Sequence, residues 1–417
     1  MSKRGLIIIL FICTCIVGVY AQNNTSSPYT RYGYGGLVDA GFGQNKSMGG
    51  ISFGLRANKF TNPGNPASYT AIDTLTFRFE AAASLKFSSY EDASGKQSRM
   101  NGNLEYIAFQ FPIKKWLGVS AGLLPYSFVG YDFSSKVTKP SSITGGSLET
   151  TYLYEGSGGI SQFYLGAAVI PFQNFSLGAN FNLNFGTINH ASSATFNDKA
   201  YYPTLQSNMI RVADASGLLG AQYTLSLPKE RKVTFGAIFQ PKFSLAGKAE
   251  RTIITTGIDT VKITDNNKFD LPLTFGTGFV YNFSERLLAG FDYQYQAWSD
   301  VRFFGEKAFV DRNKFSLGVE FQPNGNSKNY FNRIYYRAGA NYSNLYTKVN
   351  GKDLDEYVLS AGLGLPLKRG LNPTVLNMVF EFGNIGIAAP DLIKEQYFKF
   401  TLNMTINERW FMVRKFD

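Results

Sequence analysis

The chain has 417 residues, among them 42 Gly, 37 Phe and 25 Tyr, and is therefore rich in strand formers and aromatic side chains. Its single His and two Cys are too few for the usual zinc or transition-metal ligand sets, so we expect neither a metal site nor a cofactor. The net charge of +11 leaves nucleic acid, anionic lipid and acidic ligands as candidate partners.

The first 21 residues have the pattern of a secretory signal peptide. A charged start is followed by a short apolar core and by small residues before Gln22. Both cysteines, Cys13 and Cys15, fall inside this segment, so we expect the mature chain to have no thiol. A secreted chain without a basic low-complexity arm argues against nucleic acid as a partner.

Residues 22–72 are rich in Gly, Asn and Ser and show no sustained alternation of apolar and polar positions. They nevertheless carry large apolar side chains such as Tyr34, Phe42 and Met48. Such a segment can fill an enclosed space, but it cannot extend the wall of a sheet. We therefore predict that it forms a hatch inside the structure built by the residues that follow.

From about residue 73 to residue 411, apolar residues recur at every second position, most clearly in residues 75–87 and 175–186. Because strand side chains point alternately to opposite faces, one face suits hydrocarbon and the other suits water or a polar lumen. Many runs reach about ten residues, the length that a tilted strand needs to cross a bilayer. No apolar run after the signal reaches the ~18 residues of a spanning helix, and only a closed barrel lets strands cross lipid.

The alternation predicts 14 strands, and hence an all-β, 14-stranded antiparallel transmembrane β-barrel over residues 73–411. Short and long connections follow one another, as in outer-membrane barrels with tight periplasmic turns and longer outer loops. Residues 412–417 are expected to form a basic periplasmic tail. The expected outer loops lie near residues 89–101, 132–157, 189–206, 247–268 and 300–311.

The three tryptophans fall at predicted strand ends. Trp116 and Trp410 lie at periplasmic ends, and Trp298 lies at an outer end. Because Trp is enriched where a membrane meets water, this placement predicts an interface belt.

The pattern also places charged side chains on the lumenal face, and Arg78, Lys86, Arg337 and Lys399 are the candidate ligand contacts among them. A charge that faces lipid would cost about 2–4 kcal/mol, so the inward direction is expected in any barrel. Two interpretations stay open. The charges form salt bridges with the hatch, or a cation binds the carboxylate of a ligand whose tail lies against apolar walls.

No catalytic site is expected. Residues 118–122 match the G-x-S-x-G motif, but that motif requires a strand, a sharp turn and a helix, and here it lies inside an alternating strand. The single possible base, His190, should lie roughly 25 Å or more from Ser120 at ~3.3 Å per strand residue. We therefore predict that the protein is not an enzyme.

Two regions carry a family resemblance. The first is Ser47-Met48-Gly49-Gly50 followed by Asn62-Pro63-Gly64-Asn65-Pro66-Ala67-Ser68, and the second is the strand pair between Leu271-Pro272 and Gln296-Ala297-Trp298-Ser299. Together they resemble the outer-membrane long-chain fatty-acid transporter (FadL/TodX) family. The resemblance implies that Asn62, Pro63, Asn65 and Pro66 end the hatch and lead into the first strand.

The resemblance also implies a side opening at a disrupted third strand, which in this chain contains Gly122 and Pro125. Proline removes a hydrogen-bond donor from the ladder, and glycine weakens or bends a strand. The alternative interpretation is that these residues only let the wall curve.

By resemblance, we expect a protein of the outer membrane of a Gram-negative-type bacterium that takes up hydrophobic molecules passively, such as long-chain fatty acids, through a plugged lumen and a side opening. Its partners would be outer-membrane lipid and hydrophobic small molecules. The second hypothesis is a non-transporting structural or interaction barrel in a secretion or assembly complex, with other envelope proteins as partners. The resemblance implies this role for some relatives in the branch.

Overall fold

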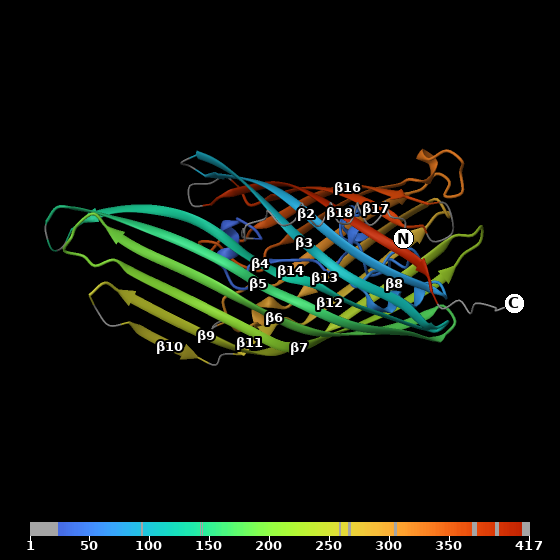
Figure 1. Cartoon of the computed structure of the whole chain (residues 1–417), viewed down its shortest axis with the longest axis horizontal. Helices are drawn as coiled ribbons and strands as arrows, with labels where there is room; N and C mark the ends of the chain where they lie inside the picture. Colours follow the sequence, from blue (N-terminus) through green and yellow to red (C-terminus); the bar gives the residue numbers. More distant parts are fainter. Residues whose placement is uncertain are drawn as a thin grey trace, which may run out of the picture.

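The computed structural model describes residues 24–410 except 93–94, 142, 144, 258–259, 266–267, 304–306, 369–372 and 388–391. The chain forms a closed antiparallel β-barrel around its N-terminal segment (Figure 1). The predicted all-β barrel with an N-terminal lumenal hatch is confirmed. No helix within the described part of the chain is long and apolar enough to cross a membrane. The expected signal peptide and the expected basic tail lie outside the described residues.

The sheet contains 18 strands, and the wall accounts for 14 positions. The short strand β1 (Gly36–Leu37) belongs to the hatch, β8 and β9 share one wall position, and β10, β11 and β12 share another. The wall strands are β2 (Thr76–Asp92), β3 (Gly95–Lys114), β4 (Leu117–Pro140), β5 (Ser147–Phe172), β6 (Phe175–Phe196), β7 (Thr204–Ser226), β8 (Lys232–Gln240), β9 (Phe243–Thr255), β10 (Val261–Asp265), β11 (Lys268–Leu271), β12 (Thr274–Asn282), β13 (Leu287–Gln296), β14 (Arg312–Phe321), β15 (Tyr335–Asn344), β16 (Asp355–Pro366), β17 (Val375–Ile385) and β18 (Lys394–Arg409).

Two features of the sequence explain this wall. Pro241 separates β8 from β9, and Pro272 separates β11 from β12, because a proline cannot donate to the ladder. The barrel closes where the last strand, β18, pairs with the first wall strand, β2, in an unbroken register from Lys394↔Glu91 to Arg409↔Thr76. Closure pairs the strand edges that could not otherwise lie in lipid.

The alternation of the sequence corresponds to the two faces of the wall. On β6, Phe181, Leu183 and Phe185 are exposed on the outer surface, whereas Asn180 and Asn184 are buried toward the lumen. Similar exposed Phe and Leu residues recur on the other wall strands. An apolar outer surface of this extent suits the hydrocarbon of a bilayer.

The hatch fills the lumen with residues 24–75, which precede β2. Its ordered elements are η1 (Pro28–Arg31), β1, the short helix α2 (Gly43–Ser47) and η2 (Pro66–Ala71). Wall glycines let its backbone come very close: a Cβ at Gly236 would lie 1.8 Å from the Phe53 carbonyl oxygen. A Cβ at Gly339 would lie 2.1 Å from the backbone nitrogen of Gly49. The hatch therefore docks directly on the wall, and no side chain lies between them at these points.

The predicted outer loops are for the most part strands. β4 and β5 remain paired as far as Pro140↔Ser147, and β6 and β7 remain paired as far as Ala194↔Thr204. The prediction of long loops there was wrong because alternation requires lipid on one face. Beyond the membrane both faces meet solvent, so the pattern fades although the backbone pairing continues.

Two of the three tryptophans have the exposure that the predicted interface belt requires. Trp116 and Trp410 are exposed on the outer surface, and Trp410 stacks on Phe77 with ring centroids 4.3 Å apart. Trp298 is fully buried inside the barrel, so its assignment to the belt was wrong. It lies in the short helix η3 (Trp298–Asp300), which turns inward after β13.

Candidate functional site

The wall has a seam between β3 and β4. Their pairing runs only from Lys114↔Leu117 to Ile107↔Leu123. Beyond that point β3 continues along β2 as far as Gly95, and β4 continues along β5 as far as Pro140. The seam thus separates residues 95–106 of β3 from residues 124–140 of β4.

Local irregularities on both strands explain where the seam begins. The register of β4 against β5 shifts between Pro125 and Ser127, and the register of β3 against β2 skips Glu105. Such bulges bend a strand and increase its twist, and Pro125 offers no backbone donor to β3. Gly122, the other residue predicted to mark a side opening, lies just before the seam and still pairs with Ala108.

The start of the hatch lies along both edges of the seam. On the β4 side, β1 pairs through Gly36↔Phe128, and the Thr30 hydroxyl accepts a hydrogen bond from the Gly130 backbone nitrogen at 3.1 Å. On the β3 side, the Asn101 side chain donates to the Ser26 hydroxyl at 3.1 Å. We call residues 24–38 the strap, because they span the seam from the lumenal side.

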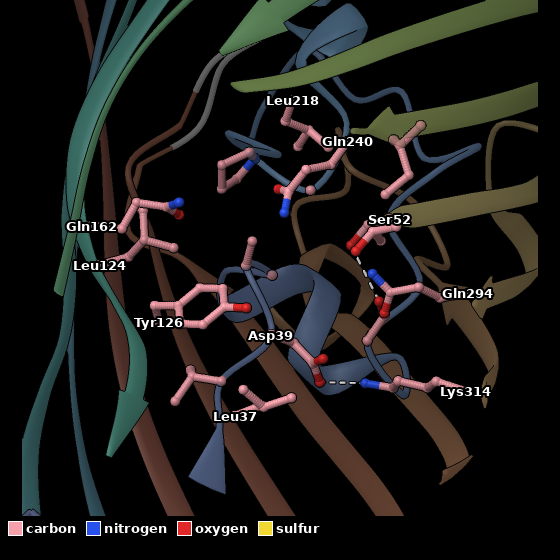
Figure 2. Close-up of a pocket in the computed structure, with 18 of the residues that line it drawn as sticks. Leu37, Asp39, Ser52, Leu124, Tyr126, Gln162, Leu218, Gln240, Gln294 and Lys314 are labelled. Carbon is pink, nitrogen blue, oxygen red and sulfur yellow. Dashed lines mark hydrogen bonds and ion pairs between the residues drawn. The ribbon is translucent and has the colours of Figure 1, made fainter. Parts of the chain in front are cut away.

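A cavity of about 130 Å³ adjoins the seam (Figure 2). Leu124 and Tyr126 of β4 and Leu37 of the strap form one side of it. The glutamines Gln162, Gln240 and Gln294 point into the same space from three different strands. The cavity is therefore small and mixed in character, with apolar side chains beside the seam and amides elsewhere.

The floor of this cavity is charged but internally paired. Lys314 of β14 forms an ion pair with Asp39 of the hatch. Burial opposes ionisation of Asp39, but the positive charges of Lys314 and Arg312 outweigh it and lower the pKa of Asp39 to about 2. The carboxylate is therefore ionised at neutral pH, and the pair attaches the hatch to the wall.

A second cavity, of about 220 Å³, lies on the other side of the strap. Two of the predicted ligand contacts, Lys86 and Lys399, line it together with Glu381. The ammonium of Lys86 lies 3.0 Å from a carboxylate oxygen of Glu395 and 4.1 Å from the ring centroid of Tyr397. Lys86 therefore reaches the cavity with its charge already compensated.

Glu105 is the centre of the charge network beside this cavity. Its carboxylate accepts hydrogen bonds from Lys399 at 2.7 Å and from the Ser84 hydroxyl at 2.5 Å, and it also pairs with Lys46 of α2. The sequence pattern did not identify Glu105, because the skipped residue on β3 turns both Glu105 and Tyr106 inward. No residue type at this position in the sequence indicates that the register of β3 against β2 shifts here.

The other two predicted ligand contacts, Arg78 and Arg337, are buried in the wall and face the hatch. The Arg78 guanidinium donates to the side chains of Asn407 and Gln110 and to the Asn58 carbonyl of the hatch. Arg337 donates to Glu320 at 2.6 Å and to Asn377 at 2.7 Å, and it stacks over the hatch ring of Phe60. Both guanidiniums thus bind protein groups, and neither lines the two cavities beside the strap.

The predicted hatch motif holds the inner turns together. The Asn62 amide donates to the Ser52 carbonyl, and the Asn65 amide donates to the Phe53 carbonyl at 2.8 Å. The Asn65 side chain also accepts from Ala67 at 3.1 Å and so caps η2, whose first residue is Pro66. The Pro63 carbonyl accepts from Asn180 of the wall at 3.4 Å.

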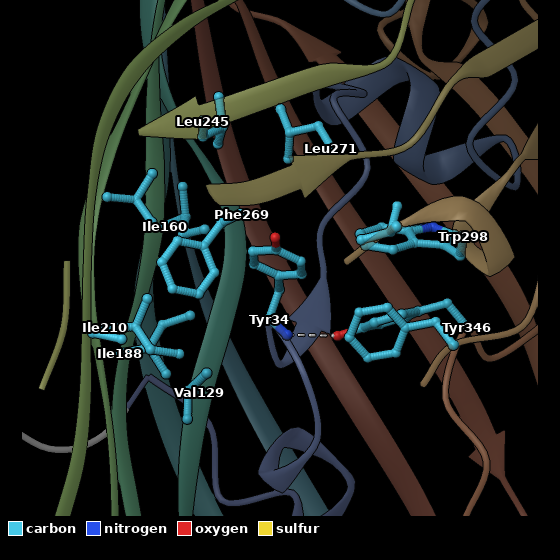
Figure 3. Close-up of a cluster of buried hydrophobic side chains, with 14 of the residues drawn as sticks. Tyr34, Val129, Ile160, Ile188, Ile210, Leu245, Phe269, Leu271, Trp298 and Tyr346 are labelled. Atoms are coloured by element: carbon cyan, nitrogen blue, oxygen red, sulfur yellow. Dashed lines mark hydrogen bonds between the residues drawn. The ribbon is translucent and has the colours of Figure 1, made fainter. Parts of the chain in front are cut away.

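An apolar cluster lies inside the barrel, between the strap and the wall (Figure 3). Tyr34 of the strap lies at its centre, against Trp298 and Tyr346. The Tyr34 backbone nitrogen donates to the Tyr346 hydroxyl at 3.0 Å, and the wall residues Ile188 and Ile210 cover the other side. No pattern in the sequence indicated this cluster, because its members come from the strap, the wall and the connections between strands.

Ser120 and His190, the serine and histidine considered for catalysis, form hydrogen bonds with different partners and not with each other. The Ser120 hydroxyl donates to the Phe109 carbonyl at 2.8 Å, whereas His190 Nδ1 pairs with the Tyr131 hydroxyl at 2.7 Å. Among the described residues, no group of three or more His, Cys, Asp or Glu side chains could hold a metal ion.

A family model described as BamG matches residues 1–417, the whole length of the chain. The chain belongs to the BamG family. No curated protein matches it. The family model therefore relates the chain to other proteins by sequence, and solved structures relate it to other proteins by fold.

Several solved structures are similar to this BamG-family chain at low identity. The Pseudomonas aeruginosa FadL homologue is 14% identical, with 88% of this chain and 98% of that chain covered and a TM-score of 0.61. The Pseudomonas putida toluene transporter TodX is 14% identical, with 90% and 99% covered and a TM-score of 0.59. The Ralstonia pickettii toluene transporter TbuX is 14% identical, with 89% and 99% covered and a TM-score of 0.57. The predicted FadL/TodX-like resemblance is thus confirmed, and at this identity it establishes the fold.

Proposed function

We propose that this BamG-family protein is an outer-membrane barrel through which hydrophobic molecules pass passively between the lumen and the membrane. The observation that carries the proposal is the seam: pairing of β3 with β4 ends at Leu123, beside a cavity lined by Leu124 and Pro125. A barrel wall without such a gap gives an apolar molecule no route from lumen to lipid. The toluene transporters TodX and TbuX, which share this fold, support the same class of cargo.

The substrate class is narrower than the fold alone suggests. The cavity beside the seam is too small and too rich in amides to enclose a long acyl chain while the hatch is in place. A long-chain fatty acid could place its acid group near Lys86 or Lys399 in the larger cavity, but it would compete there with Glu395 and Glu105. We therefore favour compact hydrophobic molecules over long-chain fatty acids as the first substrates to test.

A disulfide that fixes the strap in the seam tests this function. Leu37 and Ser127 are direct partners in the β1–β4 register, so a pair of cysteines there has the close spacing that a disulfide needs. The oxidised L37C/S127C protein should take up labelled toluene poorly, and a reductant should restore uptake. A matched disulfide at Ser193 and Leu205, partners on β6 and β7 away from the seam, should have no effect. Unchanged uptake by oxidised L37C/S127C would refute a route through the seam.

A second candidate function is an accessory, non-transporting barrel in an envelope complex. Membership of the BamG family is consistent with the accessory-barrel branch expected from the sequence. The internal pairing of all four predicted ligand cations also favours it, because no lumenal cation among them is left for a cargo molecule. Purification in mild detergent distinguishes the two functions: proteins at a fixed stoichiometry support the accessory role, and bound hydrophobic molecules without them support transport.

A further inference from the structure

One part of the barrel wall continues past the apolar cluster as a free-standing sheet, built from β4 to β7 with β9 and β10 (Figure 1). On the opposite side the wall is shorter, because β13 ends at Gln296 and β15 ends at Asn344. We call this extension the crest. It comprises residues 131–140, 147–156, 190–196, 204–208, 251–255 and 261–263.

The register of the crest assigns each residue to a face. Val129, Ile188 and Ile210 belong to the lumenal apolar cluster, so every second residue beyond them lies on the same, inner face. On β4 and β5 these inner residues are Tyr131, Phe133, Ser135, Val137, Lys139, Leu148, Thr150, Tyr152 and Tyr154. On the other crest strands they are His190, Ser192, Ala194, Phe196, Thr204, Gln206, Asn208, Arg251, Ile253, Thr255, Val261 and Ile263.

The two faces of the crest differ in charge. The acidic residues of the crest segments, Asp132, Glu149 and Glu155, all lie on the outer face by this register. The outer Lys136 is paired there with Glu149 at 3.0 Å. The inner face has no acidic residue in the crest segments. Its exposed Lys139 and Arg251 have no carboxylate partner within the described residues, and Arg251 donates a hydrogen bond to the Asn208 side chain at 3.1 Å.

The inner face also carries a row of aromatic rings. Phe133 and Tyr154 have ring centroids 5.2 Å apart, and Tyr152 stacks on Tyr154 at 6.3 Å. The guanidinium of Arg31, which reaches in from the strap, lies 4.0 Å from the Tyr154 ring centroid. Tyr, Phe and Arg without acidic residues are the composition of the central part of protein–protein interfaces, and Tyr and Arg dominate their energetics.

Two free strand edges border the crest. Among the described residues, no strand pairs with residues 131–140 of β4 on the side that faces the seam. Likewise, β10 pairs with β9 and with no other strand among them. Exposed edges of this length invite pairing, and soluble proteins commonly cover or disrupt them. Only a polypeptide can pair with such an edge, whereas a glycan could stack on the rings but could not continue the sheet.

From the charge, the rings and the edges together, we propose that the inner face of the crest is a docking surface for an acidic polypeptide segment of another cell-surface protein. Lys139 and Arg251, which have no carboxylate partner among the described residues, supply the complementary charge. The ring row supplies the buried contact, and the edges supply backbone partners. This assignment requires the crest end of the barrel to face outward, which is the orientation predicted from the sequence. It does not depend on passage through the seam, so either proposal can fail alone.

Photo-crosslinking in living cells tests this docking surface with a control one residue away. A photoreactive phenylalanine at Ser135 faces the inner side of the crest, and the same group at Ser134 faces the outer side. We expect a protein adduct of one defined mass from position 135 and at least tenfold less from position 134. Equal adducts at both positions, no adduct, a glycan adduct or an adduct with a second copy of this chain would each overturn the proposal.

The charge requirement is tested with the segment that mass spectrometry identifies in the adduct. A synthetic peptide of that segment should carry net negative charge and should bind the purified barrel in detergent. Binding should weaken at least tenfold in K139E/R251E and at high salt, because charge attraction between exposed groups is screened. Lys136→Glu on the outer face is the matched control and should leave binding unchanged. A neutral or basic segment, or unaltered binding by K139E/R251E in a barrel that still resists SDS unfolding, would contradict the proposal.

Discussion

Glu105→Gln is the sharpest test of how the hatch is held. The Glu105 side chain is completely buried and compensates two ammonium groups, Lys46 of the hatch and Lys399 of β18. Removing one member of a buried ion pair costs about 3–5 kcal/mol, because the remaining charge stays buried without compensation. Since glutamine retains an acceptor and Glu381 lies beside Lys399, we expect the lower end, about 3 kcal/mol, or a ~150-fold change in the unfolding equilibrium.

The urea midpoint of the band shift in unboiled SDS gels measures this loss in purified protein. Glu149→Gln, which breaks the exposed pair with Lys136, is the matched control and should change stability by less than about 1 kcal/mol. The double variant K46M/E105Q should recover part of the loss, because Lys399 is then the single cation near Glu381. A Glu105→Gln midpoint equal to that of the wild type would refute the reasoning, since it would mean that the two ammoniums need no carboxylate.

Three further predictions concern the hatch and the orientation. Deleting residues 24–72 should raise the conductance of the barrel to small ions in planar bilayers, and unchanged conductance would mean that the segment does not block the lumen. Gly236→Val should also raise conductance, because its side chain would occupy the place of the Phe53 carbonyl, whereas Gly217→Ala, with no atom nearer than 3.5 Å, should behave like the wild type; equal behaviour of the two variants would contradict close docking. An epitope tag near residue 145 should be labelled on intact cells and a tag at residue 114 should not, and the opposite result would reverse the orientation.

The sequence predicted the wall well wherever lipid imposes a pattern. Residues 175–186 alternate because one face of β6 meets hydrocarbon and the other meets the hatch, and the same physical cause produced the count of 14 strands. It failed on the crest, where neither face meets lipid and the strands continue without an alternating signal. The sequence-based prediction also failed for Trp298. The sequence around a Trp at a strand end is the same whether the following turn, here η3, directs the side chain inward or outward.

The candidate site was harder to predict than the wall. The alternation of positions along each strand correctly placed Arg78, Lys86, Arg337 and Lys399 on the lumenal face. The partners of these side chains depend on the register between distant strands and on a skipped residue in β3. Such contacts join residues hundreds of positions apart, so no pattern of neighbouring residues in the sequence indicates them. The start of the seam was easier to anticipate, because Pro125 breaks the donor pattern within its own strand.

The lumenal charges on β2 and β18, the two strands whose pairing closes the barrel, also bear on how the barrel assembles. β2 and β18 are the first and last strands of the wall, and no turn between them fixes their alignment. Lys86 meets Glu395 near one end of this pair, and Arg78 meets Asn407 near the other. A slip by one residue would turn the charges of one strand toward lipid, and a slip by two would separate the partners. Two contacts set far apart along the same pair thus define a single offset at which the cylinder can close.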